Sequence, residues 1–439
     1  MPPDYILINS LYPAKILLSH TLGRGKVSFD PKRCRAFRIT TPSLKEEVLE
    51  VLTLEGFEIE ELPFLEGAAL ACGGKKPLGS SIMNRFGYIY IQDLSSMLPP
   101  LYLSPPPGSR VLDMCASPGG KTSILSSLVG EGGVVVANEP NPSRGITLYK
   151  NMERMNQIGV WFTSHPGERF PLEEGFDYIL ADVPCSGWGT VEKNPAVVRL
   201  WRGKRIRRLI SLQRDILRRA IALLKGEGRM IYSTCTTNAE ENEGQIEWAI
   251  KELGVEVEPL PPVEGFVCES TPGGGLRISG GKYGGQGFFV CCVRGGNGRL
   301  DNIEERERDN FQWLDPEEIL ALLRSEGLKV EPFLKGRFYC RGRDVFFVCP
   351  HAPFHMGGRG IFLGELRDGV FSPNPALRCM VPDKGVLDTI VMDSVREVES
   401  LLQGNSLYGD FKGRFVSLYF KDLPLTLLRV KGKRCLLSR

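Results

Sequence analysis

The central part of the chain alternates short apolar runs with longer segments that carry apolar residues at helical spacing. The short runs predict strands, and they lie at Val134–Ala137, Phe176–Ala181 and Met230–Ser233. The longer segments predict helices, at Asn141–Met155 and Leu209–Leu224. Because strands that alternate with helices form parallel sheets covered on both faces, the pattern predicts an α/β fold.

Further elements are predicted ahead of these. Ser43–Gly56 begins with a serine that suits an N-cap, continues with acidic residues and ends on glycine, so it predicts a helix. Phe86–Gln92 alternates aromatic and β-branched residues and predicts a strand. A short strand ending at Asp113 then leads through a glycine-rich turn into a helix that contains Ile124 and Leu128.

The charged stretch Arg294–Asn310 follows the central region and reads as a linker. Beyond it, Val395–Leu402 predicts a short helix, and Arg414–Phe420 and Leu425–Val430 predict strands. We therefore expect an N-terminal α+β extension at residues 1–95, a central α/β domain at 96–295, a linker at 296–312 and an α+β or β-barrel-like unit at 313–439.

Composition narrows the functional classes. The 439 residues include 55 Lys and Arg against 52 Asp and Glu, a net charge of +3, so nucleic-acid affinity has to come from local basic patches. No apolar stretch reaches the length of a membrane span, and residues 1–20 lack the features of a signal peptide. We expect a cytoplasmic protein.

One basic patch follows the centre of the chain. Residues Arg199–Lys225 contain ten Lys or Arg and a single acid, Asp215. A run of this kind forms either a solvated helix face or a track for a polyanion. Its position directly after the loop that contains Cys185 favours the polyanion.

The cysteines and histidines do not predict a disulfide scaffold or a metal site. The 12 cysteines are scattered from Cys34 to Cys435 without a C-x-x-C pair, and we expect most of them to be reduced and buried. Cys349, His351 and His355 come nearest to a metal cluster. Neighbouring prolines predict an irregular loop there, and zinc sites usually bring a second ligand pair, so we expect no metal.

The segment Asp113–Thr122 ends on G-K-T, as phosphate-binding loops do, but the G-x-x-x-x-G-K-T pattern requires glycine where the chain has Cys115. The dinucleotide pattern G-x-G-x-x-G is missing as well. A glycine-rich turn followed by an acid, Glu139, at the end of the next strand still suits a ligand with a ribose, because a carboxylate can accept both ribose hydroxyls. The spacing predicts a nucleoside-containing cofactor.

Two more cysteines follow strand ends, Cys185 after I-L-A-D-V-P and Cys235 after M-I-Y-S-T. A free cysteine is often a small buried hydrophobe. At a strand end among polar and turn residues, a thiolate can instead be stabilised by nearby cations or helix N-termini. Asp182 is either a turn cap or a carboxyl group that hydrogen-bonds an amidine-like edge of a substrate.

Together these motifs resemble the RsmB/RsmF (Sun/Nop) family of S-adenosylmethionine-dependent RNA cytosine-5 methyltransferases. They follow the family's order and spacing over about residues 85–293. The matching segments are Q-D-L-S-S-M (Gln92–Met97), D-M-C-A-S-P-G-G-K-T (Asp113–Thr122), N-E-P (Asn138–Pro140), D-V-P-C-S-G-W-G (Asp182–Gly189), Y-S-T-C-T (Tyr232–Thr236), E-E-N-E (Glu240–Glu243) and G-F-F-V (Gly287–Val290). The resemblance implies a Rossmann-like methyltransferase sheet, with S-adenosylmethionine as the cofactor and RNA as the partner.

The resemblance also implies a role for each site residue. Cys235 would be the nucleophile that adds to cytosine C6, Cys185 would assist product release, and Asp182 would hold the N3 and N4 edge of the base. The base would have to leave its stack to reach both cysteines. The cofactor-binding residues would be Cys115, Ala116, Ser117, Pro118, Gly119, Gly120, Lys121, Glu139 and Asp182.

One position departs from the family. An aspartate usually precedes G-R in the third motif, on the adenine side, and this chain has Pro166 there. Proline has no side-chain acceptor, so backbone groups or another residue have to hold the adenine. An RNA-binding assembly factor with a decayed cofactor site is therefore one alternative. A DNA cytosine-5 methyltransferase that uses Cys185 as nucleophile is another, although Thr234-Cys235 and the basic tail disfavour it.

The tail resembles the RsmF branch through Gly360–Leu366 and Pro424–Arg434, where that branch carries a PUA-like RNA-binding domain. This implies that residues 1–95 and 313–439 bind RNA. It favours small-subunit ribosomal RNA over tRNA as the substrate. We expect a monomer without a membrane or metal partner.

Overall fold

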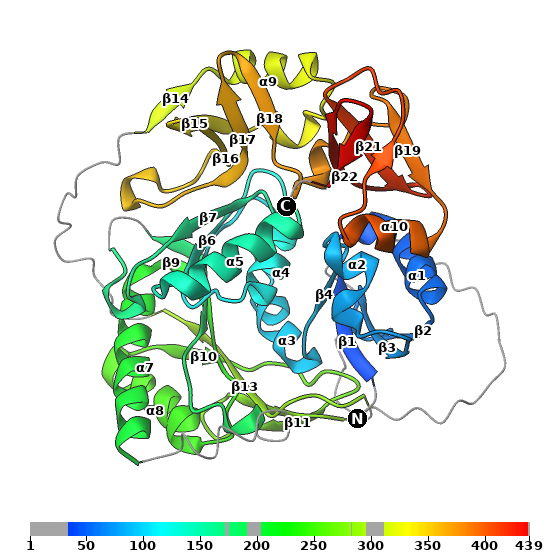
Figure 1. Ribbon diagram of the computed structural model, residues 1–439. Coiled ribbons are helices and arrows are strands. Elements are labelled where there is room, and N and C mark those ends of the chain that lie inside the picture. Colours follow the sequence, from blue (N-terminus) through cyan, green and yellow to red (C-terminus); the bar gives the residue numbers. More distant parts are fainter. Residues whose placement is uncertain (1–33, 172–174, 191–202, 282, 296–310, 438–439) are drawn as a thin grey trace.

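The computed structural model describes residues 34–171, 175–190, 203–281, 283–295 and 311–437, and Figure 1 shows their arrangement. Parallel strands form its centre, in the order β9-β8-β5-β6-β7. Their bounds are β5 Arg110–Asp113, β6 Val134–Asn138, β7 Val160–Thr163, β8 Phe176–Asp182 and β9 Leu224–Thr234. Antiparallel strands extend the sheet beyond β9, namely β13 Phe288–Arg294, β12 Leu276–Ser279 and β11 Val267–Ser270, with β10 Glu256–Glu258 paired to β13.

Helices cover both faces of this sheet. One face carries α3 Leu94–Leu103, α4 Gly120–Val129 and α5 Pro142–Arg154, and the other carries α7 Gly203–Leu223 and α8 Glu243–Leu253. The first apolar core includes Leu98, Leu125, Leu148, Val111 and Val135, and the second includes Leu217, Ile246, Leu112 and Val134. Successive strand residues point to opposite faces, so each central strand contributes to both cores. The predicted α/β architecture is confirmed.

The order of the strands places the crevice of the sheet. The chain runs outward from β5 to β6 and β7, and then returns to the other side of β5 to form β8. At such a reversal, the loops after neighbouring strands diverge and leave a crevice at the carboxyl ends of the strands. The loops after β5, β6, β8 and β9 hold the residues for which the sequence predicts chemistry.

A four-stranded sheet precedes this domain, in the order β2-β3-β1-β4. Its elements are β1 Cys34–Ile39, α1 Lys45–Leu54, β2 Phe57–Glu61, β3 Ala68–Gly73, α2 Ile82–Arg85 and β4 Ile89–Ile91. A disulfide joins Cys34 of β1 to Cys72 of β3, and the other ten cysteines are free. The scattered spacing of the cysteines does not predict this pair.

Two further sheets follow residues 296–310, which lie outside the described part of the chain and contain most of the predicted linker. The first has the order β14-β15-β16-β17-β18, and the second β19-β21-β22-β23-β20. The elements of the first are β14 Gln312–Leu314, α9 Pro316–Ser325, β15 Arg337–Arg341, β16 Asp344–Val348, β17 Ile361–Arg367 and β18 Val370–Pro373. Those of the second are β19 Thr389–Met392, α10 Val395–Leu402, β20 Leu407–Tyr408, β21 Phe415–Phe420, β22 Leu423–Lys431 and β23 Arg434–Leu436.

The last sheet shares a hydrophobic core with the N-terminal sheet, although they lie at opposite ends of the sequence. Phe37 and Val51 pack in one cluster with Leu418 and Leu428. Figure 1 shows α10 beside α1 and α2, and α10 contacts α2. The two ends of the chain therefore fold together around a common core. Among the described helices, none combines the length and apolarity needed to cross a membrane.

Candidate active site

The carboxyl ends of β8 and β9 bring the two candidate cysteines together. The strands are parallel with Asp182 opposite Ser233, so the residues that follow them lie at the same edge of the sheet. Cys185 Sγ lies 3.3 Å from Cys235 Sγ, at hydrogen-bonding distance for a thiol and a thiolate. The Gly189 N–H donates to the Cys235 carbonyl at 3.0 Å and ties the two loops to each other.

The two thiols differ in acidity. The hydrogen bond from Cys185 lowers the pKa of Cys235 below its usual value, and the nearby Lys121 ammonium also lowers it, against the effect of burial. The pKa of Cys185 is raised well above its usual value, first by the same hydrogen bond and then by burial. Cys235 is therefore the thiol that ionises first, and Cys185 is the S–H that stabilises its thiolate.

Asp182 lies beside the thiols, in a network with an ammonium group. Lys121 Nζ donates to Asp182 Oδ2 at 2.7 Å and to Ser96 Oγ at 2.9 Å, while Ser233 Oγ donates to Asp182 Oδ1 at 2.8 Å. The ammonium lies 5.3 Å from the centre of the Phe288 ring. Burial alone would lower the pKa of Lys121, but the Asp182 carboxylate outweighs it and the pKa is raised, so the side chain is cationic.

A cavity of about 290 Å³ opens between this network and the glycine-rich turn. Asp182, Lys121 and Cys235 line one part of it, and Asp113 with the turn residues lines another. The family resemblance predicts that Lys121 binds the cofactor. In the structure, its ammonium points at Asp182, which lies beside the thiols.

The turn between β5 and α4 brings backbone close to its neighbours. Gly119 has a φ of 107°, and a Cβ there would lie 2.5 Å from the Met152 side chain. A Cβ on Gly120 would lie 2.8 Å from the Tyr90 ring. Glycine at both positions therefore allows the N-terminus of α4 to face the cavity with free backbone N–H groups.

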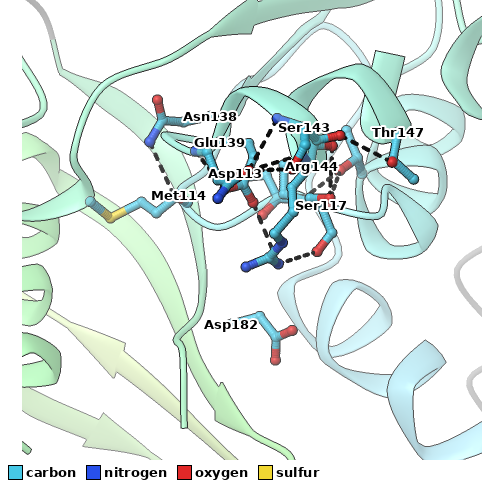
Figure 2. Close-up of polar contacts among 12 residues, drawn as sticks. Asp113, Met114, Ser117, Asn138, Glu139, Ser143, Arg144, Thr147 and Asp182 are labelled. Atoms are coloured by element: carbon cyan, nitrogen blue, oxygen red, sulfur yellow. Dashed lines mark hydrogen bonds and ion pairs between the residues drawn. The ribbon is translucent and has the colours of Figure 1, made fainter. Parts of the chain in front are cut away.

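Arg144 of α5 connects this turn to the end of β6, as Figure 2 shows. Its guanidinium donates to the Ser117 carbonyl at 3.0 Å and lies 3.4 Å from Glu139 Oε2. The Asn141 N–H donates to Glu139 Oε1 at 2.9 Å. Glu139 is buried and held in place, and Figure 2 shows Asp182 apart from this group of contacts.

Asp113, at the end of β5, is a site residue that the sequence interpretation missed. Thr122 Oγ1 donates to its Oδ2 at 2.7 Å, whereas Oδ1 is buried and has no hydrogen-bond partner among the described residues. Burial raises the pKa of Asp113 to about 7. Its place at the end of the motif strand, D-M-C-A-S-P-G-G-K-T, is the signal that could have identified it.

The residues present fit S-adenosylmethionine. The unpartnered oxygen of Asp113 would accept a hydrogen bond from the ammonium of the methionine part, because a buried polar atom requires a donor. The same cavity is lined by Cys115, Ala116, Ser117, Pro118 and Gly120. The Glu139 carboxylate suits the ribose hydroxyls. Burial raises the pKa of the Cys115 thiol, so this cysteine is unreactive and acts through its backbone.

Pro166 lies in the loop that follows β7. The backbone of the preceding residue binds Asn138 of β6, with His165 N donating to Asn138 Oδ1 at 2.9 Å and Asn138 Nδ2 donating to the His165 carbonyl at 2.8 Å. The loop is thus held over the end of β6 through its main chain, and the proline ring adds no hydrogen-bonding group.

The basic run belongs mostly to α7, and several of its cations have partners within the protein. The Arg214 and Arg218 guanidinium groups each lie 5.3 Å from the centre of the Trp248 ring. Arg219 Nε donates to a backbone carbonyl at 3.2 Å. Residues 199–202 of the run lie outside the described residues. Part of this positive charge therefore packs α7 against its neighbours.

The Cys349, His351 and His355 segment does not form a cluster in the structure. Cys349 is buried and burial raises the pKa of its thiol to about 12, whereas His351 is exposed. Within the described residues, no three His, Cys, Asp or Glu side chains come together in an arrangement that could hold a metal ion.

Comparison with known proteins gives consistent matches to the central domain. Residues 100–294 match the family described as 16S rRNA methyltransferase RsmB/F. "Ribosomal RNA small subunit methyltransferase F" of Serratia proteamaculans is 36% identical over 272 residues, 59% of this chain and 56% of the relative. Its namesake from Shewanella sp. (strain MR-7) is 34% identical over 266 residues, 58% of this chain and 55% of the relative. The chain thus spans little more than half the length of the curated relatives it matches.

Solved structures also resemble this chain. A methyltransferase homologue from Pyrococcus horikoshii is 32% identical, with a TM-score of 0.51 over 60% of this chain and 86% of that one. NSun6 from Pyrococcus horikoshii, solved with SFG, has the same fold, with a TM-score of 0.54 and 21% identity over 60% of this chain and 91% of that one. The central domain, residues 100–294, thus matches the RsmB/F methyltransferase family.

Proposed function

We propose that this chain transfers a methyl group from S-adenosylmethionine to C5 of a cytosine in RNA, with small-subunit ribosomal RNA favoured over tRNA. The observation that carries the proposal is the pair of thiols at 3.3 Å, one with a lowered and one with a raised pKa, beside a carboxylate and an ammonium. The family match supports the reaction class, and the names of the curated relatives support the ribosomal substrate.

Cytosine C5 is too electron-poor to take a methyl group directly, so the reaction needs a nucleophile. The Cys235 thiolate adds to C6 and turns C5 into an enamine-like carbon. S-adenosylmethionine, when bound, supplies an electrophilic methyl group. After transfer, C5 carries a methyl group and a hydrogen, and C6 is bonded to Cys235 Sγ.

Asp182 and Lys121 prepare the base for this addition. The thiolate brings negative charge onto the ring, and a proton that N3 takes up from water neutralises it; N3 returns this proton to water when the thiolate leaves. A carboxylate at the N3 and N4 edge accepts hydrogen bonds from the protonated ring and from the exocyclic amine. Lys121 holds that carboxylate at 2.7 Å and adds the positive charge that helps to keep Cys235 ionised.

Product release breaks two bonds. The C5 proton leaves to water and its electron pair forms the C5=C6 double bond, while the electron pair of the C6–S bond returns to Cys235. Cys185 assists this step by donating its S–H to the departing sulfur, at the distance that it already keeps in the free protein. The products are 5-methylcytosine, S-adenosylhomocysteine and the Cys235 thiolate, so the nucleophile is regenerated.

A methyl-transfer assay on separated RNA classes tests the proposal. Purified protein, radiolabelled S-adenosylmethionine and RNA from cells that lack the gene should give label in small-subunit ribosomal RNA, and bisulfite sequencing should place it at a discrete cytosine. Label confined to tRNA would identify tRNA as the substrate instead. RNA binding without label in any class would contradict the enzyme and identify an assembly factor.

A further inference from the structure

A buried polar cluster contacts the loops that contain Cys185 and Cys235, and it takes no direct part in the chemistry proposed above. Its centre is Glu241, between β9 and α8, which is fully buried. The carboxylate accepts hydrogen bonds from neutral donors, namely Ser186 N at 2.8 Å, Ser186 Oγ at 2.5 Å, Gln213 Nε2 at 3.0 Å and Asn238 Nδ2 at 3.1 Å. A buried carboxylate is costly unless donors satisfy its oxygens, so the surrounding loops are constrained to keep these contacts.

Glu241 and Gln213 hold both chain neighbours of Cys185. The Gln213 amide donates to the Pro184 carbonyl at 3.0 Å, and Glu241 accepts the N–H of Ser186. Gln213 is itself fixed by the buried Gln245, whose amide donates to Gln213 Oε1 at 3.1 Å. The peptide units on either side of Cys185 therefore have little freedom to move.

The same cluster reaches the loop of the nucleophile. Ser186 Oγ lies 2.8 Å from the hydroxyl of Thr236, the residue directly after Cys235. Asn242 Nδ2 donates to the Thr236 carbonyl at 3.0 Å. The residues that follow the two cysteines, Ser186 and Thr236, are therefore hydrogen-bonded to each other. Glu241 holds this pair in place through its hydrogen bonds to Ser186.

We propose that Glu241 and Gln213 are positioning residues that hold the Cys185 S–H against the Cys235 sulfur. In Glu241→Gln, one carboxylate oxygen becomes an NH₂ group that faces N–H or O–H donors, so the Ser186 loop has to move. In Gln213→Ala, the Pro184 carbonyl loses its donor. Either change should loosen the contact between the thiols without removing a group that touches the substrate.

Thiol alkylation tests this without RNA or cofactor. The full-length protein is treated with iodoacetamide from pH 6 to 10, and modification of the Cys235 peptide is followed by mass spectrometry. The reaction midpoint of Cys235 should rise by roughly one pH unit in both variants, because the Cys185 hydrogen bond is what chiefly stabilises its thiolate. Glu55→Gln is the matched control, since Glu55 is also buried and accepts a backbone N–H at 2.9 Å, from Ile82. In this control, the alkylation midpoint of Cys235 should equal that of the wild type. An unchanged Cys235 midpoint in folded Glu241→Gln and Gln213→Ala would overturn the proposal.

The catalytic consequence rests on the proposed function and is measured separately. At a pH above the Cys235 midpoint of the variant, where the thiolate is formed, Glu241→Gln should slow multiple turnover at least about tenfold and accumulate covalent protein–RNA adduct, while single-turnover methyl transfer falls less than about threefold. A merely structural defect would reduce both rates together and leave no adduct, which would contradict a positioning role in release. If the wild type methylates no RNA, the proposed function fails, and the alkylation profile still decides whether Glu241 and Gln213 position the thiols.

Discussion

Cys185 Sγ lies 3.3 Å from Cys235 Sγ, and the hydrogen bond between them lowers the pKa of Cys235 while it raises that of Cys185. The bond therefore distinguishes two half-buried thiols that follow the ends of adjacent strands. In the proposed reaction, Cys235 attacks the base, and Cys185 stays protonated and assists the departure of the Cys235 sulfur. This asymmetry gives opposite predictions for the two cysteine variants.

Cys235→Ala should abolish methyl transfer, with a loss of at least about 10³-fold, because the base can no longer be activated by addition at C6. Incorporation of labelled methyl groups into RNA measures this. Cys340→Ala, which removes a free thiol on β15, should retain full activity. Substantial turnover by Cys235→Ala would refute the assignment of the nucleophile.

Cys185→Ala should trap the covalent intermediate. Cys235 can still attack, but the departing sulfur loses the S–H that stabilises it, so protein–RNA adduct should accumulate and run as a shifted band on denaturing gels. Loss of the hydrogen bond also raises the pKa of Cys235 toward its usual value, so the first addition should need higher pH than in the wild type. The double variant Cys185→Ala/Cys235→Ala should give no adduct. Normal turnover by Cys185→Ala would show that release does not depend on this thiol.

Asp113 should make both stability and cofactor binding depend on pH. Its pKa is raised by burial to about 7, so the folded protein binds a proton that the unfolded chain releases near pH 4. Stability is therefore lost as pH rises between about 4 and 7. Asp113→Asn removes this loss, and above pH 7 it should be more stable than the wild type by up to about 4 kcal/mol, which is 1.36 kcal/mol for each of roughly three pKa units. The difference should vanish near pH 4.

Thermal unfolding at pH 4.5, 6 and 8.5 measures the stability of the Asp113 variant. Calorimetry with S-adenosylhomocysteine at pH 8.5 should show the reverse effect on binding, because the neutral amide cannot pair with the ammonium of the ligand. A variant that is equally stable and binds equally well at every pH would show that Asp113 is ionised in the free protein and does not hold the cofactor.

Gly189→Ala should displace the Cys235 loop. A Cβ at this position would lie 2.2 Å from the Gly287 carbonyl oxygen and 2.8 Å from that of Cys235, and backbone atoms cannot yield as a flexible side chain can. The variant should lose about 1–3 kcal/mol of stability, as overpacked sites do, and most of its methyl-transfer activity. Gly226→Ala is the control, since nothing lies within 4 Å of its Cβ position. Denaturant unfolding measures the stability, and the RNA assay measures the activity. Unchanged stability and activity in Gly189→Ala would contradict the close approach.

Local patterns in the sequence predict much of the central domain, because its strands and helices are short, alternate regularly and carry their own caps. Asn141, for example, accepts N–H groups at the start of α5, where the helix is predicted to begin. α3 is harder to predict because Pro99 and Pro100 lie inside it. An Asp93 cap and a largely buried apolar surface outweigh the cost of the prolines there.

The rest could not be read from local pattern because it depends on contacts between distant segments. The core shared by Phe37 and Leu418 joins opposite ends of the chain, and periodicity within either segment does not reveal the partner. Similarly, the acidic Glu241 belongs to a charged motif, yet it is fully buried because donors from the loop after β8, from α7 and from the turn before α8 converge on it. The cysteine pair was predictable because parallel neighbouring strands end at the same edge of a sheet.

Pro166→Asp should strengthen cofactor binding. The loop that holds Pro166 is fixed to Asn138 through its main chain, so an aspartate at this position can present a carboxylate without moving the backbone. One added hydrogen bond of about 1 kcal/mol would tighten binding of S-adenosylhomocysteine roughly fivefold. Isothermal titration of the wild type, Pro166→Asp and Pro166→Ala separates the new acceptor from the loss of the proline ring, since only the aspartate should bind more tightly. Submicromolar binding by the wild type, with no gain in Pro166→Asp, would mean that backbone groups of this loop already satisfy the adenine.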